Sequence, residues 1–459
     1  MTSRRTAGRG AARAALAAAA LIVAAGTVSS AASRPTRLQY ELLNLPNGMT
    51  VVLSEDHSTP IVHLQMWYHV GSKNEKPGRT GFAHLFEHLM FKGSKNVEPE
   101  MHTSYISGVG GQSNAYTTDD ETVFWETVPA QYLPMVLWLE ADRMATLRIN
   151  KDSFANERDV VKEERRLRID NQPYGRLSEI LYDQAFTTHP YKHPTIGSMA
   201  DLDAASVEDV RDFYNTYYVP ANATAIIVGD FDPVQAKELV TRYLGRVPKA
   251  ERPVPRDIPQ EPAQTKERRV TVDTPASWPL PAVVVAYHVV RDGDPDSYPL
   301  HIASKVLSDG QSSRIYQQLV YKQQLAAAAF GGANIIEDPN LFYAVAIVQP
   351  GKTTEQAANA LIAEMDRLRN EPISERELRR TKNQFARDYI LQRESNQQKA
   401  LQLGHAVVIH GDIGTADGEF EIFQTLTVAD IQRVAQKYFI PENRLVLTLV
   451  PGGRSGGSR

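Results

Sequence analysis

Residues 207–229 read VEDVRDFYNTYYVPANATAIIVG, and the same design returns at 428–448 as VADIQRVAQKYFIPENRLVLT. In each stretch a helical pattern of apolar residues ends at an aromatic pair and a proline, and an alternating strand pattern follows. The second stretch begins 221 positions after the first, and upstream WYHV at 67–70 is echoed 219 positions later by AYHV at 286–289. Two matches at nearly one offset predict one domain written twice; two unrelated helix–proline–strand units are the simpler alternative.

The repeat divides the chain into two domains of similar size. We expect the first at 33–250 and the second, a diverged copy, at 270–459, both within the usual range for a single domain. The stretch 251–269 between them carries four prolines among many charged residues and has little apolar periodicity, which is typical of a linker.

Each copy is expected to hold strands first, then helices, then a closing strand. Val, Ile and Leu with partial alternation at 51–67 predict strands, and apolar residues at helical spacing predict helices at 357–368 and 375–391. We therefore expect an α+β fold in which each domain packs helices on a mostly antiparallel sheet.

The composition excludes several classes of protein. The 459 residues are 42% hydrophobic and 23% charged, which is ordinary for a globular protein and excludes a disordered chain, a collagen-like fibre and a polytopic membrane protein. A formal net charge of -4 offers no global basic field, so no nucleic-acid partner is expected. The chain has no cysteine, which excludes disulfides, thiolate zinc sites, cysteine nucleophiles and a cysteine-linked lipid anchor.

Residues 1–32 have the three-part pattern of a secretory signal peptide: arginines without acids, an apolar run at 14–25 and a Ser-Ala-Ala end. The run is too short to span a bilayer, and no later stretch is apolar for about 18 residues, so we expect no integral membrane span in the mature chain. We expect export, to the periplasm or as a secreted protein. A transit peptide to the mitochondrial matrix and an Ala-rich tail are the alternatives, and Arg4-Arg5 leaves general secretory and twin-arginine export both open.

Residues 81–94 read GFAHLFEHLMFKGS and contain His84-x-x-Glu87-His88, the inverted zinc motif H-x-x-E-H. The local pattern is helical, and histidines four apart lie on one helical face, so their imidazoles can meet at one ion. Glu87 can border such an ion without ligating it, where a general base would stand. The simpler alternative is a helix with two partly buried histidines.

A catalytic zinc commonly takes three protein ligands, so a third must come from elsewhere. The charged stretch 151–169 is predicted to be helical, and Glu157 and Glu164 share one face of it because they are seven apart, while Glu163 lies on another. A solvated helix laced with Glu–Arg pairs is the alternative interpretation of this segment.

These features together resemble the pitrilysin/insulinase (M16) family of zinc metallopeptidases, in the short form of the mitochondrial processing peptidase subunits and many bacterial peptidases. The likeness covers most of the mature chain. It includes the block at 81–93, the block ERDVVKEE at 157–164, the Gly110-Gly111-x-x-Asn114-Ala115 turn and strand, and the duplicated domain. The resemblance implies two homologous domains that form half of a clamshell.

The resemblance also implies roles for individual residues. His84, His88 and Glu164 would ligate one Zn²⁺ per chain, Glu87 would be the base that activates the attacking water, and Glu157 would orient a ligand by hydrogen bonds. The implied reaction is hydrolysis of peptide bonds by a zinc endopeptidase without a covalent intermediate.

Substrate binding is implied at the strand that follows the Asn-Ala turn, at Asn114, Ala115 and Tyr116. In the family this strand receives the peptide as an added strand, which favours extended or unfolded peptides and gives weak sequence selectivity. An ordinary turn residue is the alternative for Asn114.

The chain departs from the family pattern in its second copy. Adding 219 to His84 leads to Ala303, in a stretch without H-x-x-E-H, so one metal centre of this kind is expected per chain. Family members with a complete site also carry an arginine and a tyrosine seven residues apart in the second half of the clamshell. Val320 and Ala327 stand at these positions here, and neither can donate a side-chain hydrogen bond to an oxyanion.

We therefore expect a heterodimer with a zinc-less homologous subunit that supplies the Arg/Tyr pair; a homodimer is possible, and a weak peptidase is the alternative. The main rival function is a non-catalytic zinc-binding scaffold or chaperone-like subunit of the same family, and an unrelated secreted binding protein is the second. His57, His189, His405 and His410 have no ligand spacing and are interpreted as surface or core residues.

Overall fold

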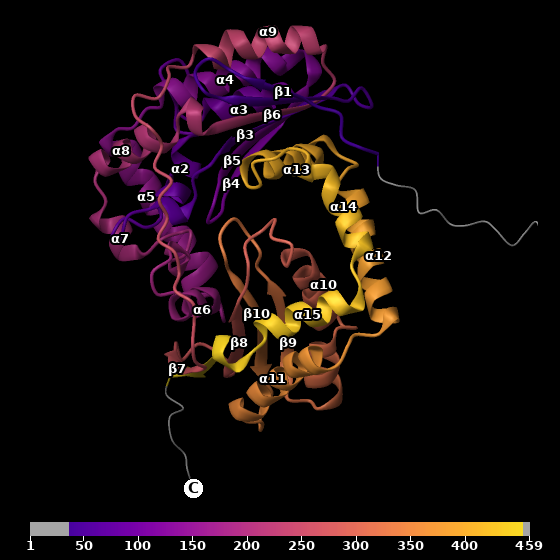
Figure 1. The fold of residues 1–459 in the computed structure, drawn as a ribbon. Coiled ribbons are helices and arrows are strands. Elements are labelled where there is room, and N and C mark those ends of the chain that lie inside the picture. Colours follow the sequence, from indigo (N-terminus) through magenta and orange to yellow (C-terminus); the bar gives the residue numbers. More distant parts are fainter. Residues whose placement is uncertain (1–35, 453–459) are drawn as a thin grey trace, which may run out of the picture. The chain divides into compact units, whose positions relative to one another are not determined.

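Two β-sheets organise residues 36–452, the part of the chain that the computed structural model describes (Figure 1). The predicted signal peptide at 1–32 lies outside these residues. The first sheet has the strand order β1-β2-β6-β3-β5-β4. Its strands are β1 (Glu41–Asn44), β2 (Thr50–Glu55), β3 (Ile61–Tyr68), β4 (Gln112–Thr117), β5 (Thr122–Pro129) and β6 (Ala223–Gly229).

The second sheet repeats the first without its outermost strand β1, in the order β7-β11-β8-β10-β9. In each sheet one neighbouring pair is parallel, β2 with β6 and β7 with β11, and the other pairs are antiparallel. The predicted duplication and the α+β class with mostly antiparallel sheets are therefore confirmed. The strands are β7 (Arg268–Thr274), β8 (Ala282–His288), β9 (Ala326–Ala333), β10 (Leu341–Val348) and β11 (Arg444–Pro451).

The helices predicted at 357–368 and 375–391 are confirmed as α11 (Thr354–Asn370) and α12 (Glu375–Leu391). The expected order of strands, then helices, then one strand is wrong, because a hairpin follows the first helices in each copy. The remaining helices are α2 (Phe82–Leu89), α3 (Met101–Gly108), α4 (Leu133–Thr146), α5 (Lys151–Arg165), α6 (Leu177–Ala185), α7 (Met199–Ala204), α8 (Val207–Tyr217), α9 (Pro233–Tyr243), α10 (Ser297–Ser308), α13 (Asn396–Val408), α14 (Thr415–Thr425) and α15 (Val428–Tyr438).

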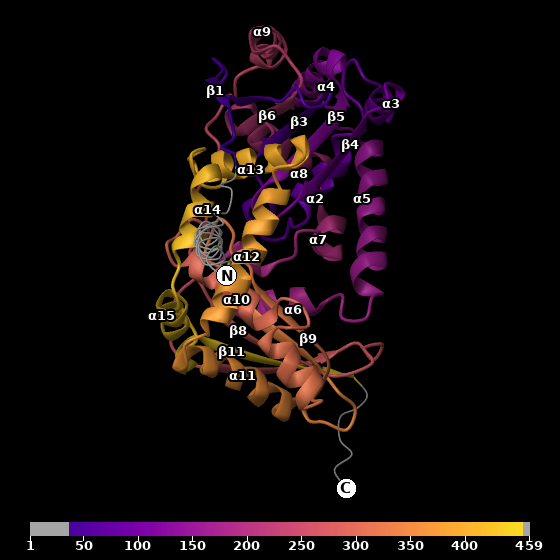
Figure 2. The ribbon, with the colours of Figure 1, turned by 90° about the vertical axis from the view of Figure 1, so that its right-hand side faces the viewer.

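Both faces of each sheet are covered at its centre, which explains why the inner strands, such as β6, β8 and β10, are nearly continuous in buried apolar residues. In β2, Val51 and Leu53 point into the core beneath α2, α4 and α8, and Val52 between them points to the opposite face. The second sheet alternates in the same way, and α11 packs against its strands β8 and β10 (Figure 2).

The two halves of the chain exchange one helix each. α13, from the second half, packs on β3 and β6 of the first sheet (Figure 1), and α6, from the first half, packs its buried leucines on the opposite face of the second sheet. The approach of α13 is so close that a Cβ on Gly404 would lie 2.3 Å from the Trp67 ring, so this position requires glycine. α6 and α13 begin 219 positions apart, at Leu177 and Asn396, so equivalent helices are exchanged.

The predicted linker at 251–269 has no regular secondary structure before β7 begins at Arg268. No helix or strand occurs between Arg246 and Arg268, and the Glu261 carboxylate in this stretch accepts hydrogen bonds from the backbone N–H groups of Thr187, Thr188 and His189. The domain boundaries given above stay a prediction. Across residues 36–452 the structure contains no helix with the length and apolar character needed to cross a membrane.

Candidate metal centre

The helix α2 begins at a tightly packed glycine and a buried carboxylate. Gly81 adopts φ 94°, and a Cβ there would lie 2.7 Å from the carbonyl oxygen of Ile196, so the position requires glycine. The Glu75 carboxylate accepts hydrogen bonds from the backbone N–H groups of Gly81 and Ala83, both at 2.8 Å, which satisfies donors that the first turn leaves free. The start of the helix is thereby fixed.

The helical spacing divides α2 into a core face and a site face. Leu85, Phe86 and Leu89 are buried in the core of the first half. His84 and His88 lie on the other face, with ring centroids 5.0 Å apart. The predicted juxtaposition of the two imidazoles on one helical face is therefore observed.

The helix α5 packs against α2 and brings Glu164 to both histidines. The Glu164 Oε2 atom lies 3.3 Å from His88 Nε2 and 3.6 Å from His84 Nε2, so three potential ligand atoms converge. Glu163 points away and is exposed, as its place on the helix predicted. Two imidazole nitrogens and one carboxylate oxygen are a donor set that suits zinc, which prefers three protein ligands at catalytic sites.

The protonation of His84 fits this donor set. Burial, together with the neighbouring His88, lowers the pKa of His84 to about 4, so its imidazole is neutral at physiological pH. Its Nδ1 atom is buried without a hydrogen-bond partner. A neutral imidazole is the form that ligates a metal ion.

Glu157 lies two helical turns before Glu164 and contacts the other ring nitrogen of His88. Its Oε2 atom is 3.6 Å from His88 Nδ1, and its Oε1 atom is 3.2 Å from Lys92 Nζ. Burial raises the pKa of Glu157, but the contacts with His88 and Lys92 outweigh it and lower the pKa. A carboxylate held ionised against the far nitrogen of an imidazole can fix the orientation of that ring. Arg168, one turn after Glu164, forms an ion pair with its other oxygen.

Glu87 points toward the end of strand β4, away from the contact between His88 and Glu157. Its Oε2 atom accepts a hydrogen bond of 2.8 Å from the Thr117 hydroxyl. Burial raises the pKa of Glu87, while the Thr117 hydrogen bond opposes that shift. A carboxylate with a raised pKa is suited to take up and return a proton near neutral pH. Thr117 was missed by sequence reasoning, since nothing local relates it to Glu87.

The predicted substrate strand is the outer strand of the first sheet. β4 pairs only with β5 among the described strands, so its other edge is free for a further strand. Along it, Asn114 is exposed, Ala115 is buried, and Tyr116 packs edge-on against Trp67. A cavity of about 470 Å³ reaches from His84 and Thr117 on this side to residues that include Glu164, Tyr182 and Asn334.

The second half has no such centre on its equivalent helix. Ala303, in α10, is buried in the second core. Val320 is half-buried in a π-helical segment (Tyr316–Lys322), and Ala327 is exposed at the start of β9. Arg314 cannot take the missing arginine's place, because its guanidinium is bound to Glu377 at 2.8 Å.

His405 and His410, which were interpreted as surface or core residues because they have no ligand spacing, meet a carboxylate in the fold. Both imidazoles lie within contact distance of Asp292, which is more than 100 residues earlier in the chain. The spacing of five between the histidines is not a helical-face spacing, so no local sequence signal marks this meeting.

Comparison with known proteins defines the class. A family profile described as "Insulinase (Peptidase family M16)" matches residues 50–199, and one described as "Peptidase M16 inactive domain" matches residues 204–385. The "Zinc protease PqqE" of Helicobacter pylori is 31% identical over 415 residues, which cover 90% of this chain and 93% of that protein. This chain therefore belongs to the insulinase family, peptidase family M16.

Further similarities agree with this assignment. The crystal structure of a protease from Helicobacter pylori superimposes with a TM-score of 0.86 at 31% identity and covers 90% of this chain and 100% of that chain. The "Mitochondrial-processing peptidase subunit beta" of Saccharomyces cerevisiae is 24% identical over 414 residues, 84% of this chain and 86% of that protein. The names of the relatives connect this fold with zinc and proteolysis.

Proposed function

We propose that this chain is a zinc-dependent endopeptidase that hydrolyses extended or unfolded peptides. The observation that carries the proposal is the convergence of His84 Nε2, His88 Nε2 and Glu164 Oε2, with the half-buried Glu87 carboxylate on the helix of the two histidines. A zinc ion held by these three residues supplies polarisation of the scissile carbonyl and acidification of the attacking water.

Glu87 serves as the general base in this proposal. It removes a proton from the attacking water and later delivers a proton to the leaving amine, and burial raises its pKa toward the range that this exchange needs. The Thr117 hydroxyl fixes the carboxylate by donating to Oε2, which leaves Oε1 for the water. Glu157 positions the His88 ring by its contact with Nδ1.

The substrate binds along β4 as an added strand. The unpaired edge of β4 offers backbone groups at Asn114 to Tyr116, and β4 ends at Thr117, the residue that contacts Glu87. A peptide aligned along this edge therefore passes the base. Recognition through backbone hydrogen bonds favours extended chains over folded ones.

A partner subunit completes the site. Val320 and Ala327 leave the second half without a donor for the oxyanion, and Arg314 is bound to Glu377. A zinc-less homologous subunit that supplies an arginine and a tyrosine would provide it. One relative is named a subunit of a processing peptidase, which supports a heterodimer. The pattern of residues 1–32 supports export to the periplasm or beyond, with the mitochondrial matrix as the alternative.

A second candidate is a non-catalytic zinc-binding subunit with a scaffold or chaperone-like function. The replacement of both oxyanion donors favours it, since these positions have no other evident function in the described structure. The intact set of His84, Glu87, His88 and Glu164 argues against it, because a scaffold does not need the base.

The test compares wild type with Glu87→Gln, with and without candidate partner subunits, on quenched-fluorescent unstructured peptides. Zinc at this centre is measured as the difference from a His84→Asn/His88→Asn variant. We expect about one zinc at the centre in both proteins and a rate about 10²–10⁴-fold lower in Glu87→Gln. Glu163→Gln, an exposed carboxylate on α5, is the matched control. Equal zinc with no hydrolysis in any mixture would favour the scaffold, and no zinc would refute the proposal.

A further inference from the structure

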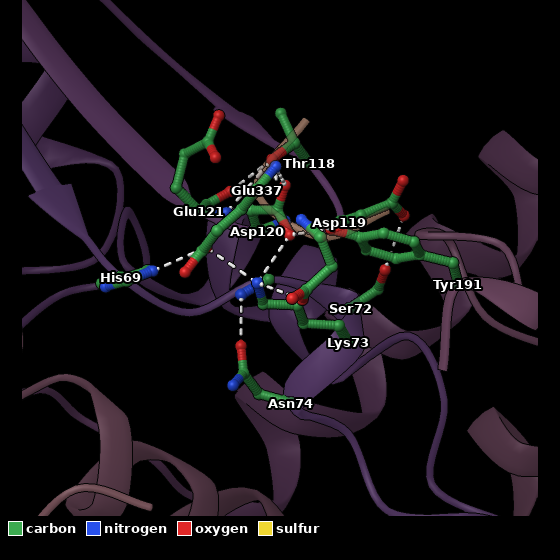
Figure 3. A network of polar contacts seen from close by, with 12 residues as sticks. His69, Ser72, Lys73, Asn74, Thr118, Asp119, Asp120, Glu121, Tyr191 and Glu337 are labelled. Atoms are coloured by element: carbon green, nitrogen blue, oxygen red, sulfur yellow. Dashed lines mark hydrogen bonds and ion pairs between the residues drawn. The ribbon is translucent and has the colours of Figure 1, made fainter. Parts of the chain in front are cut away.

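The two copies place different charges at one equivalent position. Five residues after the tyrosine of the repeated Tyr-His pair, the first copy has Lys73 and the second has Asp292. In the first copy the Lys73 Nζ atom lies 2.9 Å from Asp120 and 2.7 Å from Glu337 (Figure 3), and 3.0 Å from Asp338. The lysine side chain is 4% exposed. This cluster of Lys73, Asp120, Glu337 and Asp338, called the Lys73 corner below, therefore contains its own buried cation.

In the second copy the carboxylate of Asp292 faces two imidazoles. Its Oδ2 atom lies 2.8 Å from His405 Nε2 and 3.1 Å from His410 Nε2. His410 stands 219 positions after Tyr191, whose hydroxyl joins the Lys73 corner by donating to Asp120. His410 thus stands at a position equivalent to a member of the Lys73 cluster, but the second copy has an acid where the first has the lysine.

The hydrogen bonds of His410 define which of its nitrogens carries the proton. The Thr415 hydroxyl donates to the carbonyl oxygen of Asp412 at 2.7 Å, so its oxygen accepts from His410 Nδ1–H at 2.9 Å. In the neutral imidazole, Nε2 then presents a lone pair. That atom is buried and lies 3.1 Å from the Oδ2 atom of Asp292. Two lone-pair atoms at this distance require a cation between them, which is either a proton on Nε2 or a metal ion.

The surroundings of the cluster favour a bound ion. The side chains of His410 and Asp292 are 6% and 11% exposed, whereas that of His405 is 42% exposed, so two of the three ligands are shielded from water and the third faces solvent. His405 and His410 line a cavity of about 280 Å³ together with Glu419 and Glu121.

Another cluster of three potential ligands, with one histidine and two glutamates, shows the contrast. His102, Glu126 and Glu140 also lie close together, but the Arg143 guanidinium binds Glu140 at 2.9 Å and Glu126 at 3.2 Å. That group therefore has its cation in the chain. Around Asp292 the described structure places no lysine or arginine in ion-pair contact.

We propose that Asp292, His405 and His410 form a second metal site, for a divalent ion of the zinc class. Two imidazoles and one carboxylate select zinc or a related transition metal over magnesium or calcium, which prefer oxygen ligands. The ion links the loop after β8 to α13, the helix that the second half packs on the first sheet. Its function is to fasten the exchanged helix to the half from which it comes.

The test removes the first centre and measures what remains. The full chain with His84→Asn/His88→Asn is loaded with Zn²⁺, dialysed against metal-free buffer and analysed for metal. We expect about one equivalent of zinc, and loss of it when His405→Asn/His410→Asn is added. Substitution with Co²⁺ should give the visible absorption of a tetrahedral site, a readout that needs neither activity nor the second pair of substitutions. His57→Asn is the matched control: its carboxylates, Glu55 and Asp230, lie at opposite ring nitrogens and cannot share one ion with it.

Thermal melting gives an independent measurement. Zinc should raise the melting temperature of the His84→Asn/His88→Asn protein and of the same protein with His57→Asn, and should leave the protein with His405→Asn/His410→Asn unchanged. Absence of zinc, of the cobalt spectrum and of the melting shift in the His84→Asn/His88→Asn protein would reduce the cluster to an ion pair and overturn the proposal. If that variant does not fold, titration of the metal-free wild type with Co²⁺ decides: two binding steps support the second site and one step excludes it.

Discussion

The helices α2 and α10 occupy the same place in the two copies, yet only α2 carries ionisable side chains at the three positions of the metal motif. His84, Glu87 and His88 correspond to Ala303, Val306 and Leu307, and these three residues of α10 are fully buried. α12 and α15 pack against α10 as the equivalent helices α5 and α8 pack against α2. In the second copy the three positions are filled by apolar side chains of the core, whereas in the first copy His84 borders a cavity. One fold therefore serves either chemistry or packing, and the side chains at these three positions decide which.

The clusters around Lys73 and Asp292 also occupy equivalent places in the two copies and differ in their side chains. Lys73 brings a covalently attached cation to three acids, whereas Asp292 gathers two imidazoles around an acid. A buried ammonium cannot leave, while a metal ion can be removed by a chelator. The Lys73 corner is thus held together under all conditions, and we propose that the cluster around Asp292 is held together only when metal is bound.

The first prediction removes the metal centre that distinguishes α2 from α10, and we expect it to change activity more than the other predictions. Glu164→Gln removes the ligand that α5 contributes, and the amide is a much weaker ligand than the carboxylate. We expect zinc at the centre and peptide hydrolysis both to fall below detection. Glu157→Gln should cost roughly 10–100-fold in zinc affinity, because it touches only the far side of His88. Isothermal titration with zinc checks both. Equal losses for the two variants, or any loss in Glu163→Gln, would contradict the assigned ligands.

A second prediction breaks the corner at Lys73. Lys73→Met leaves Asp120, Glu337 and Asp338 near one another without their cation, and removal of one partner from a buried ion pair costs roughly 3–5 kcal/mol. We expect a correspondingly lower midpoint in urea unfolding. Lys76→Met is the matched control, since the Lys76 side chain is 81% exposed and its Nζ atom lies 3.7 Å from a carboxylate oxygen of Asp212. A stability loss as large in Lys76→Met would mean that the cluster around Lys73 is not the cause.

A third prediction sharpens the difference between the second half and a complete site. Val320→Arg with Ala327→Tyr restores both donors, and loss of one oxyanion donor costs roughly 10²–10³ in rate. Because the new side chains lack a shaped surrounding, we expect a gain of about 10-fold in the isolated chain. Val320→Lys with Ala327→Phe adds similar size without the guanidinium fork or the hydroxyl and should give no gain. The initial rate on an unstructured peptide is the measurement. A rate that is already high in wild type would refute the need for a partner.

Some of this organisation could be predicted from the sequence because it follows from local geometry. The spacing of His84 and His88 determines that they share a helical face, and the spacing of Glu157 and Glu164 does the same on α5. The duplication was visible because helix, proline and strand recur at one offset. The missing motif at Ala303 followed directly from that offset.

Other features depend on tertiary arrangement and leave no local signal. The exchange of α6 and α13 arises because each sheet has a second face to cover, and the sequence does not say which helix covers it. The meeting of His405 and His410 arises where α13 ends and the chain turns back, with the backbone N–H of His410 donating to the carbonyl of His405. Asp292 joins them from another element altogether.

The smallest expected effect concerns the acid stability of the Lys73 corner. Burial raises the pKa of Asp338, but contacts with His189 and Lys73 outweigh it and hold the pKa at about 2. Since the folded-state pKa lies below the ordinary value of 3.8, ionised Asp338 stabilises the fold above pH about 4, and the contribution is lost as the pH falls toward about 2. The shift corresponds to about 2 kcal/mol at neutral pH.

The charged groups around Asp338 decide how this prediction is tested. Lys73 and His189 favour its ionised form, whereas Asp120 and Glu337 share the same ammonium. We expect Asp338→Asn to melt below wild type at pH 7 and to approach it between pH 4 and 2, while Asp309→Asn, on an exposed carboxylate beside Lys305, stays parallel to wild type. If the difference between wild type and Asp338→Asn is the same at every pH, the aspartate acts by its shape and hydrogen bonds. The first corner would then owe less to its built-in cation than its geometry indicates, and the contrast with the Asp292 corner would weaken accordingly.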